Sequence, residues 1–168
     1  MLLFNGAYEH TIDAKNRVAI PAPFRSKISP ERDGRRMYIV PGDPLDSLWI
    51  YTESTFLAVA AELRSALVDQ EDLERFKRVF FSNVDDVEPD SQGRIVLPER
   101  LMRLVNLERE VMLCGAHDHI EIRNKSAYER EHAAEMSDYS GLRRKALRAL
   151  EARSRPSWPQ GEGAANQR

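Results

Sequence analysis

The chain contains the same sequence pattern twice, and this repeat limits the folds open to it more than any other feature. Residues 10–24 match residues 87–101 at a constant offset of 77, with Asp, Arg, Pro and apolar residues at the same positions. Residues 48–56 match residues 120–128 at an offset of 72, so the second copy is shorter. We expect the extra residues of the first copy at 32–36. Such a repeat predicts two copies of one supersecondary unit.

Each copy is expected to hold four short strands and one tight turn. The first two strands flank an Asp-x-x-x-Arg sequence, in which Asn16 or Gly93 can take the positive φ that reverses the chain. Pro21 and Pro98 end the second strand, because proline has no N–H to donate to a ladder. The other strands are predicted at residues 37–40 and 48–51 of the first copy and at residues 111–113 and 119–123 of the second.

Helices are predicted wherever apolar residues recur at helical spacing. A short helical turn that carries Phe24 or Leu101 is expected after each of the two prolines. Longer helices are predicted from Thr52 to about Leu67, from Asp69 or Asp72 through Phe80, from Asn124 or Ser126 to about Met136, and over residues 140–153. The buried face of the first long helix is expected to contain Phe56, Leu57, Ala60, Leu63 and Leu67.

Four short strands bury too little apolar surface to be stable alone. Two copies can exchange hairpins and close one shared, barrel-like core. We therefore predict an α+β fold made of two pseudo-symmetric swapped-hairpin β-barrel halves with flanking helices. The expected organisation is a first repeat at 1–52, a helical connector at 53–83, a second repeat at 84–124, C-terminal helices at 125–153, and a disordered tail, polar and rich in Pro and Gly, at 154–168.

The charge of the chain is unevenly distributed. A net charge of −2 and a pI near 6.1 argue against a uniformly basic nucleic-acid-binding protein. However, residues 1–36 hold seven Lys or Arg against four acids, and residues 142–155 hold six against one. Residues 53–90 hold ten acids against four bases. A polyanion can therefore be bound locally, with the acidic middle of the chain facing away.

Several functional classes are not supported by the sequence. It has no P-loop, no G-x-G-x-x-G, no H-E-x-x-H and no G-x-S-x-G, so we expect no enzyme and no cofactor. His117 and His119 alone do not make a metal site, and Cys114 is expected to be buried rather than reactive. Without a long apolar stretch or a signal-peptide pattern, a cytoplasmic location is expected.

Two motifs carry a resemblance to known proteins. Asp13-Ala-Lys-Asn-Arg17 and Asp90-Ser-Gln-Gly-Arg94, each followed by an apolar strand and proline, resemble the turn of AbrB/SpoVT-type swapped-hairpin DNA-binding domains. Together with Phe80-Phe81-Ser82-Asn83, the two copies resemble the MraZ family over residues 1–150. The resemblance implies a regulator of the bacterial division and cell-wall gene cluster that binds direct repeats of double-stranded promoter DNA. It also implies a nucleoid-associated ring of eight or more subunits.

The two turns differ in composition. Asn16 stands where the second copy has Gly93, which leaves open whether the turns have the same shape. Lys15 is matched by Gln92, so the second turn is less basic. Arg25 follows Arg17 by eight residues, where related domains also place basic residues.

These residues form the candidate site. Arginine can contact a phosphate or guanine in bidentate fashion, lysine suits the phosphate backbone, and an amide side chain suits adenine. The alternative is that each Asp–Arg pair only fastens its own turn. The candidate DNA contacts are Lys15, Asn16, Arg17, Arg25, Gln92 and Arg94. The residues expected to shape the turns are Asp13, Asp90 and Gly93.

A rival hypothesis is a protein-interaction module of antitoxin-like or scaffold type on the same fold, without DNA. The negative net charge favours it slightly. In either case, the helical regions 53–80 and 125–150 are expected to make subunit contacts, because their apolar faces exceed what a small barrel can cover.

Overall fold

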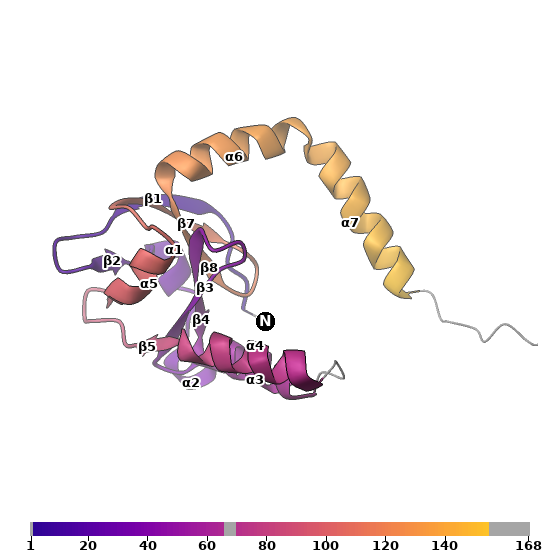
Figure 1. The fold of residues 1–168 in the computed structure, drawn as a ribbon. Coiled ribbons are helices and arrows are strands. Elements are labelled where there is room, and N and C mark those ends of the chain that lie inside the picture. Colours follow the sequence, from indigo (N-terminus) through magenta and orange to yellow (C-terminus); the bar gives the residue numbers. More distant parts are fainter. Residues whose placement is uncertain (1, 66–69, 155–168) are drawn as a thin grey trace, which may run out of the picture. The chain divides into compact units, whose positions relative to one another are not determined.

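The computed structural model describes residues 2–65 and 70–154, which form two units divided after Glu129. The first copy contains β1 (Ala7–Thr11), β2 (Arg17–Ala19), α1 (Ala22–Arg25), α2 (Pro30–Asp33), β3 (Met37–Pro41) and β4 (Ser47–Thr52). The second contains β5 (Asp85–Val87), β6 (Arg94–Val96), α5 (Glu99–Leu104), β7 (Glu110–Gly115) and β8 (Ile120–Asn124). The longer helices are α3 (Glu53–Ser65), α4 (Gln70–Ser82), α6 (Lys125–Ser137) and α7 (Tyr139–Ser154) (Figure 1).

The predicted α+β class is confirmed, and both copies follow the predicted order of strands. Helix α2 overlaps residues 32–36, where the extra residues of the first copy were expected, and the second copy has no helix at this point. The helix expected from Asp69 or Asp72 begins at Gln70; Leu67 and Asp69 lie outside the described residues. Of the predicted disordered tail, residues 155–168 also lie outside them, and Ser154 is the last residue of α7.

The strands of the two copies are interleaved in one antiparallel sheet with the order β1-β7-β8-β4-β3-β5. Strand β1 of the first copy pairs with β7 of the second, and β5 of the second copy pairs with β3 of the first. Strands β4 and β8 join the two hairpins at the centre. Within the described residues, β1 and β5 are the edges of this sheet, and β2 and β6 form a separate two-stranded ladder.

One apolar core joins the two copies. Val18 and Ile20 of the first copy and Ile95 and Leu97 of the second are buried, and each pair shares one face of its strand, as the spacing of two residues predicted. The short helices predicted after the two prolines are present as α1 and α5, and they add Phe24 and Leu101 to the same core. Since each copy supplies about half of the buried side chains, neither copy has a complete core of its own.

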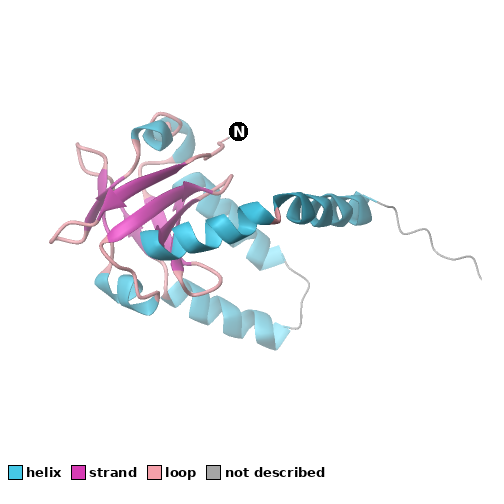
Figure 2. Cartoon of the chain, turned by 90° about the horizontal axis from the view of Figure 1, so that it is seen from above, coloured by secondary structure: helices cyan, strands magenta, loops and turns pink. Residues whose placement is uncertain are grey.

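A second, smaller cluster lies on the other face of the sheet, beneath α3 and α4. The rings of Phe56 and Tyr38 stack with centroids 4.3 Å apart, and Phe80 from α4 lies 6.4 Å from Phe56. Figure 2 shows these helices beside the strands. Leu57 was expected on the buried face of α3, which is wrong, since 57% of it is exposed. Neighbouring helical residues point about 100° apart, so α3 cannot turn both Phe56 and Leu57 to the sheet.

Candidate nucleic-acid interface

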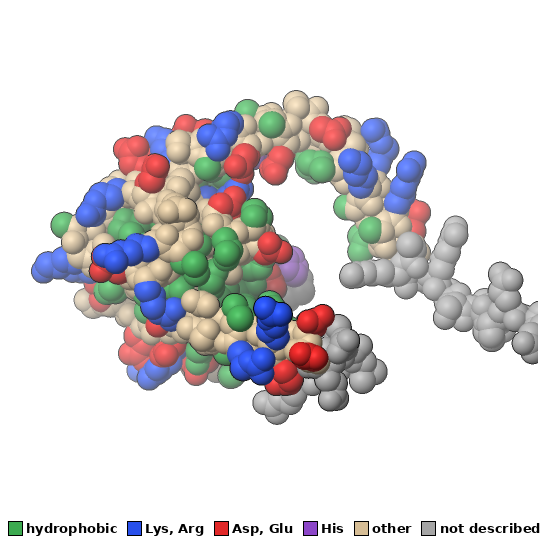
Figure 3. All heavy atoms as spheres, in the orientation of Figure 1, with side chains coloured by type: hydrophobic (Ala, Val, Ile, Leu, Met, Phe, Trp, Pro, Cys, Tyr) green, Lys and Arg blue, Asp and Glu red, His purple; other side chains and the backbone are tan. Residues whose placement is uncertain are grey.

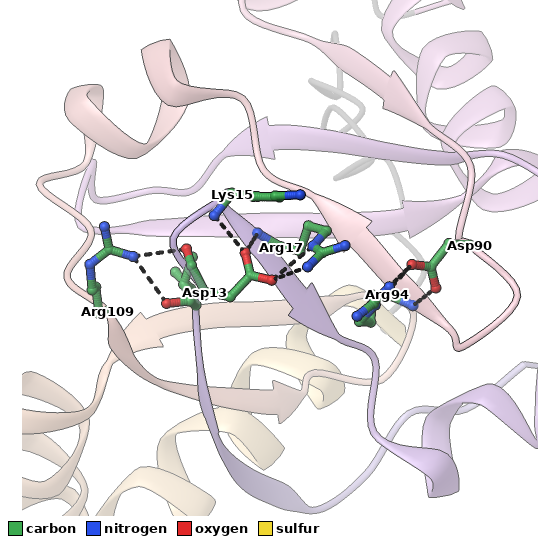
Figure 4. Close-up of polar contacts among 7 residues, drawn as sticks. Asp13, Lys15, Arg17, Asp90, Arg94 and Arg109 are labelled. Atoms are coloured by element: carbon green, nitrogen blue, oxygen red, sulfur yellow. Dashed lines mark hydrogen bonds and ion pairs between the residues drawn. The ribbon is translucent and has the colours of Figure 1, made fainter.

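The first Asp–Arg turn is held by both carboxylate oxygens of Asp13. The backbone N–H groups of Lys15 and Arg17 donate to Oδ1 of Asp13 at 2.8 and 2.9 Å. Nε and Nη2 of Arg17 both lie 2.8 Å from Oδ2, and the N–H of Asp13 donates to the carbonyl of Arg17 at 2.9 Å (Figure 4). The Asp-x-x-x-Arg spacing therefore produces a closed turn with a fixed arginine.

The second turn has the same hydrogen bonds around Asp90. The N–H groups of Gln92 and Arg94 donate to Oδ1 at 2.9 and 3.0 Å, and Nε of Arg94 donates to Oδ2 at 2.8 Å. Asn16 has φ 57° and Gly93 has φ 73°, so both take the left-handed conformation. The turns therefore have the same shape, because asparagine tolerates this region better than other residues with a Cβ.

The β2–β6 ladder brings the two turns together. Arg17 is opposite Val96, and Arg94 is opposite Ala19. Since side chains alternate along a strand, both arginines lie on the face opposite the buried Val18. Residues that are 77 apart in the sequence are thus placed on one shared surface.

Only two of the three guanidinium nitrogens of Arg17 and of Arg94 have a partner among the residues that the structure describes. Its Nε and Nη2 engage the aspartate, whereas neither Nη1 makes a hydrogen bond or ion pair within the described chain. The side chains of Arg17 and Arg94 are 30% and 31% exposed. One edge of each guanidinium is fixed by the protein, and the remaining nitrogen is available to a ligand.

The charges of both pairs are stabilised by these contacts. Hydrogen bonds from the backbone N–H and the side chain of Arg17 lower the pKa of Asp13. The side-chain hydrogen bond from Arg94, followed by its backbone N–H, lowers the pKa of Asp90 to about 2. Both aspartates are therefore ionised at neutral pH.

The side chain of Arg25, which belongs to the first copy, contacts the turn of the second copy. Its Nη1 donates to the carbonyl oxygen of Gln92 at 2.6 Å, and a Cβ at Gly93 would clash with the same nitrogen. The repeat places Met102 at the corresponding position of the second copy, where it lines a hollow beside Asn16. The two turns therefore differ in which side chain lies against them.

Sequence reasoning missed the residue that supports the first turn. Nη1 of Arg109, which precedes β7, donates to the carbonyl oxygens of Asp13 at 2.8 Å and Ile12 at 3.2 Å (Figure 4). No motif marks this arginine, because its contact depends on the pairing of β1 with β7. The other candidates, Lys15 and Gln92, are exposed at the tips of their turns.

Basic side chains gather near these turns. Figure 3 shows Lys and Arg side chains, in blue, over the end of the molecule that carries β2 and α5 in Figure 1. The net charge of −2 thus conceals a local basic region. Such a region, with fixed donors at its centre, suits a polyanion.

Cys114 and His119 are two further residues that the sequence singled out. Burial raises the pKa of the Cys114 thiol to about 11, which keeps it protonated at neutral pH. Nδ1 of His119 lies 2.8 Å from the Asp118 carboxylate, and its ring packs against Trp49.

In residues 2–65 and 70–154, no group of three or more His, Cys, Asp or Glu residues is placed to hold a metal ion. No helix in those residues is long and apolar enough to cross a membrane.

These features define a class of protein: an α+β fold made of two interleaved copies of one four-stranded unit, which places an Asp–Arg turn from each copy on one surface. Residues 3–79 and 80–149 each match the family of the MraZ protein, whose description adds the term antitoxin-like. The chain belongs to the MraZ family.

Several relatives carry the name transcriptional regulator MraZ. The one from Moorella thermoacetica is 37% identical over 145 residues, which cover 85% of this chain and 96% of that protein. The one from Acetivibrio thermocellus is 35% identical over 128 residues, covering 76% of this chain and 85% of that protein. The one from Desulforamulus reducens is 32% identical over 141 residues, covering 83% and 94%. The similarity therefore spans both copies of the repeat.

Proposed function

We propose that the protein is a sequence-specific DNA-binding transcriptional regulator, in which the two Asp–Arg turns contact double-stranded DNA from one surface. The observation that carries the proposal is the placement of Arg17 and Arg94 on one face of the β2–β6 ladder, each oriented by an aspartate. A preoriented guanidinium loses less side-chain freedom when it binds a phosphate or a guanine. The names of the relatives agree with this function.

The roles within the site follow from the chemistry of each side chain. Arg17 and Arg94 contact phosphate or guanine through the edge that the aspartate leaves open. Lys15 and Arg25 bind phosphates beside the first and second turns. Asn16 and Gln92 offer amides and main-chain groups at the two tips, and Asp13, Asp90 and Gly93 keep the turns in shape.

The exchange of strands supports a swapped-hairpin unit as the DNA-binding body. Because β1 and β5 each pair with the other copy, the repeats at 1–52 and 84–124 act as one module. We place the connector at 53–83 and the C-terminal helices at 125–153. In a closed swapped-hairpin barrel, the β2–β6 ladder would complete the wall that the six-stranded sheet leaves open.

The target and the assembly are proposed from the resemblance to the family. We infer that the protein binds direct repeats in the promoter of the division and cell-wall gene cluster, as a nucleoid-associated ring in the cytoplasm. A ring presents many weak sites at fixed spacing, which raises the overall affinity for repeated DNA. Three large apolar residues of α4 are exposed, and they support subunit contacts at this helix: Phe76, Val79 and Phe81.

An interaction module without DNA is the second candidate function. The antitoxin-like term in the family description favours it, as does the net charge of −2. In that case, the turns would bind acidic groups of a partner protein.

The dependence of DNA affinity on salt tests the proposal. The full chain is titrated with its own upstream DNA at several salt concentrations. Phosphate contacts predict that the logarithm of the binding constant falls linearly with the logarithm of the salt concentration. Lys15→Ala should reduce the slope by about one unit. Affinity that does not change with ionic strength, or no binding, would favour the interaction module.

A further inference from the structure

A pocket of about 370 Å³ lies between the two copies, next to the second turn. Its apolar floor includes the buried side chains of Ile20 and Met37 and the partly buried Ile28. Pro89, the residue before Asp90, closes one side. The volume and the mostly apolar lining are typical of sites for small organic ligands.

The pocket is at this place because the two halves are not identical. In the first turn, the N–H of Ile12 donates to the carbonyl of Arg109 at 2.8 Å. The repeat places Pro89 at the position of Ile12, and proline has no N–H to donate. The register of the ladders places Arg35 at the position of Arg109. The hydrogen bond of the first copy therefore has no counterpart here, and the longer loop that carries α2 lines the pocket.

Three arginines surround the apolar floor. Arg36 is paired with Asp86, and Arg25 donates to the neutral carbonyl of Gln92. Arg35 makes no hydrogen bond or ion pair with any residue that the structure describes. Glu88 is the acidic residue of the lining. Glu31 interacts electrostatically with Arg35, but neither Arg25 nor Arg35 forms an ion pair with a residue that the structure describes, so both guanidinium groups can pair with a ligand above the apolar floor.

We propose that this pocket binds a small organic anion, with its apolar body on the floor and a carboxylate or phosphate head at Arg35 and Arg25. Binding draws the Arg25 guanidinium away from the second turn and lowers the affinity for DNA. The pocket would then be a regulatory site. The effect on DNA rests on the proposed function, whereas the binding of the anion does not.

Equilibrium dialysis of the full chain tests the site with three probes: octanoate, octyl phosphate and the uncharged octanol. We expect at least one of the two anions to bind, about tenfold or more tightly than octanol, and the stronger anion identifies the head group. Arg35→Gln should weaken this binding about tenfold or more. Arg78→Gln, an exposed arginine on α4, is the matched control and should change nothing.

Three results would each overturn the assignment of this pocket as an anion-binding site. They are no binding of either anion, equal binding of octanol, or unchanged anion binding in Arg35→Gln. An Arg35→Gln variant that loses DNA affinity but keeps anion binding would assign Arg35 to the DNA surface instead.

A second arm tests the regulation. A saturating anion should weaken DNA binding by the wild-type chain but have no effect on DNA binding by Arg25→Gln. Unchanged DNA affinity in the saturated wild type would overturn the regulation. A chain that binds the anion but no DNA would contradict the proposed function and leave the pocket assignment in place.

Discussion

Val18 and Ile95 are opposite each other at the centre of the β2–β6 ladder, and their side chains are only 1% and 0% exposed. This pair joins the two copies in the core and fixes the register of the ladder. The register in turn places Arg17 and Arg94 on the outer face. Core packing and the geometry of the candidate site are therefore coupled through one pair of side chains.

Truncating one member of this buried pair should lower the stability of the fold substantially. Ile95→Ala is expected to lower the free energy of unfolding by about 2–5 kcal/mol, because it leaves a cavity in the shared core. The matched control is Val96→Ala, one residue along the same strand and 53% exposed, which should change it by less than about 0.5 kcal/mol. Denaturant unfolding measures both; equal effects would contradict the alternation of the strand.

A side chain at Gly93, the left-handed position of the second turn, should lower the stability of the fold. Gly93→Ala is expected to lower the free energy of unfolding by about 1–2 kcal/mol, since a Cβ disfavours this conformation. The new methyl group also displaces Arg25. Asn16→Gly, at the same position of the first turn, should change stability by only a few tenths of a kcal/mol. Thermal unfolding of both variants would reject this explanation if Gly93→Ala were neutral.

The Asp90–Arg94 pair predicts a particular dependence on pH. The pKa of Asp90 is lowered from 3.8 to about 2 in the folded chain, so the unfolded state takes up the proton first as the pH falls. The stabilisation by this carboxylate is complete above about pH 5 and is lost as the pH falls through about 2. The difference in unfolding free energy between wild type and Asp90→Asn should therefore shrink between about pH 5 and pH 2. A constant difference would show that the pair does not shift this pKa.

The contact of Arg25 with the second turn should appear as unequal protection of the two turns. Arg25→Ala is expected to speed hydrogen exchange at Gly93 and Arg94, because it removes the donor to the Gln92 carbonyl. The backbone around Asn16 should exchange as in the wild type. Mass spectrometry of the exchanged peptides measures both, with Arg103→Ala as an exposed control. Faster exchange in both turns would indicate a general loss of stability instead.

The local structure of each copy could be predicted from the sequence because it depends on neighbouring residues. The Asp-x-x-x-Arg spacing, the left-handed Gly93 and the terminating Pro21 and Pro98 each act within a few residues. Period-two alternation then gives the buried face of a strand directly. Residue identity alone left the shape of the first turn open, because asparagine is compatible with several turns.

The contacts between the copies could not be predicted in the same way. Which strand lies beside β1 depends on the whole sheet, so the support of the first turn by Arg109 and the position of Arg25 carry no local signal. The exposure of Leu57 shows the same limit, since the angle at which α3 meets the sheet decides which apolar residues it buries. Helical spacing identifies an apolar stripe but not its centre.

The most direct test of the account is the DNA affinity of Arg17→Ala, Arg94→Ala and the double variant, measured on the upstream DNA beside Arg78→Ala as a control. If both turns contact DNA from one surface, each single variant loses about 1–3 kcal/mol of binding free energy and the double variant loses more, while the chain still folds cooperatively with a lower Tm, because the arginines also hold their turns. Wild-type affinity in a folded double variant would contradict the account.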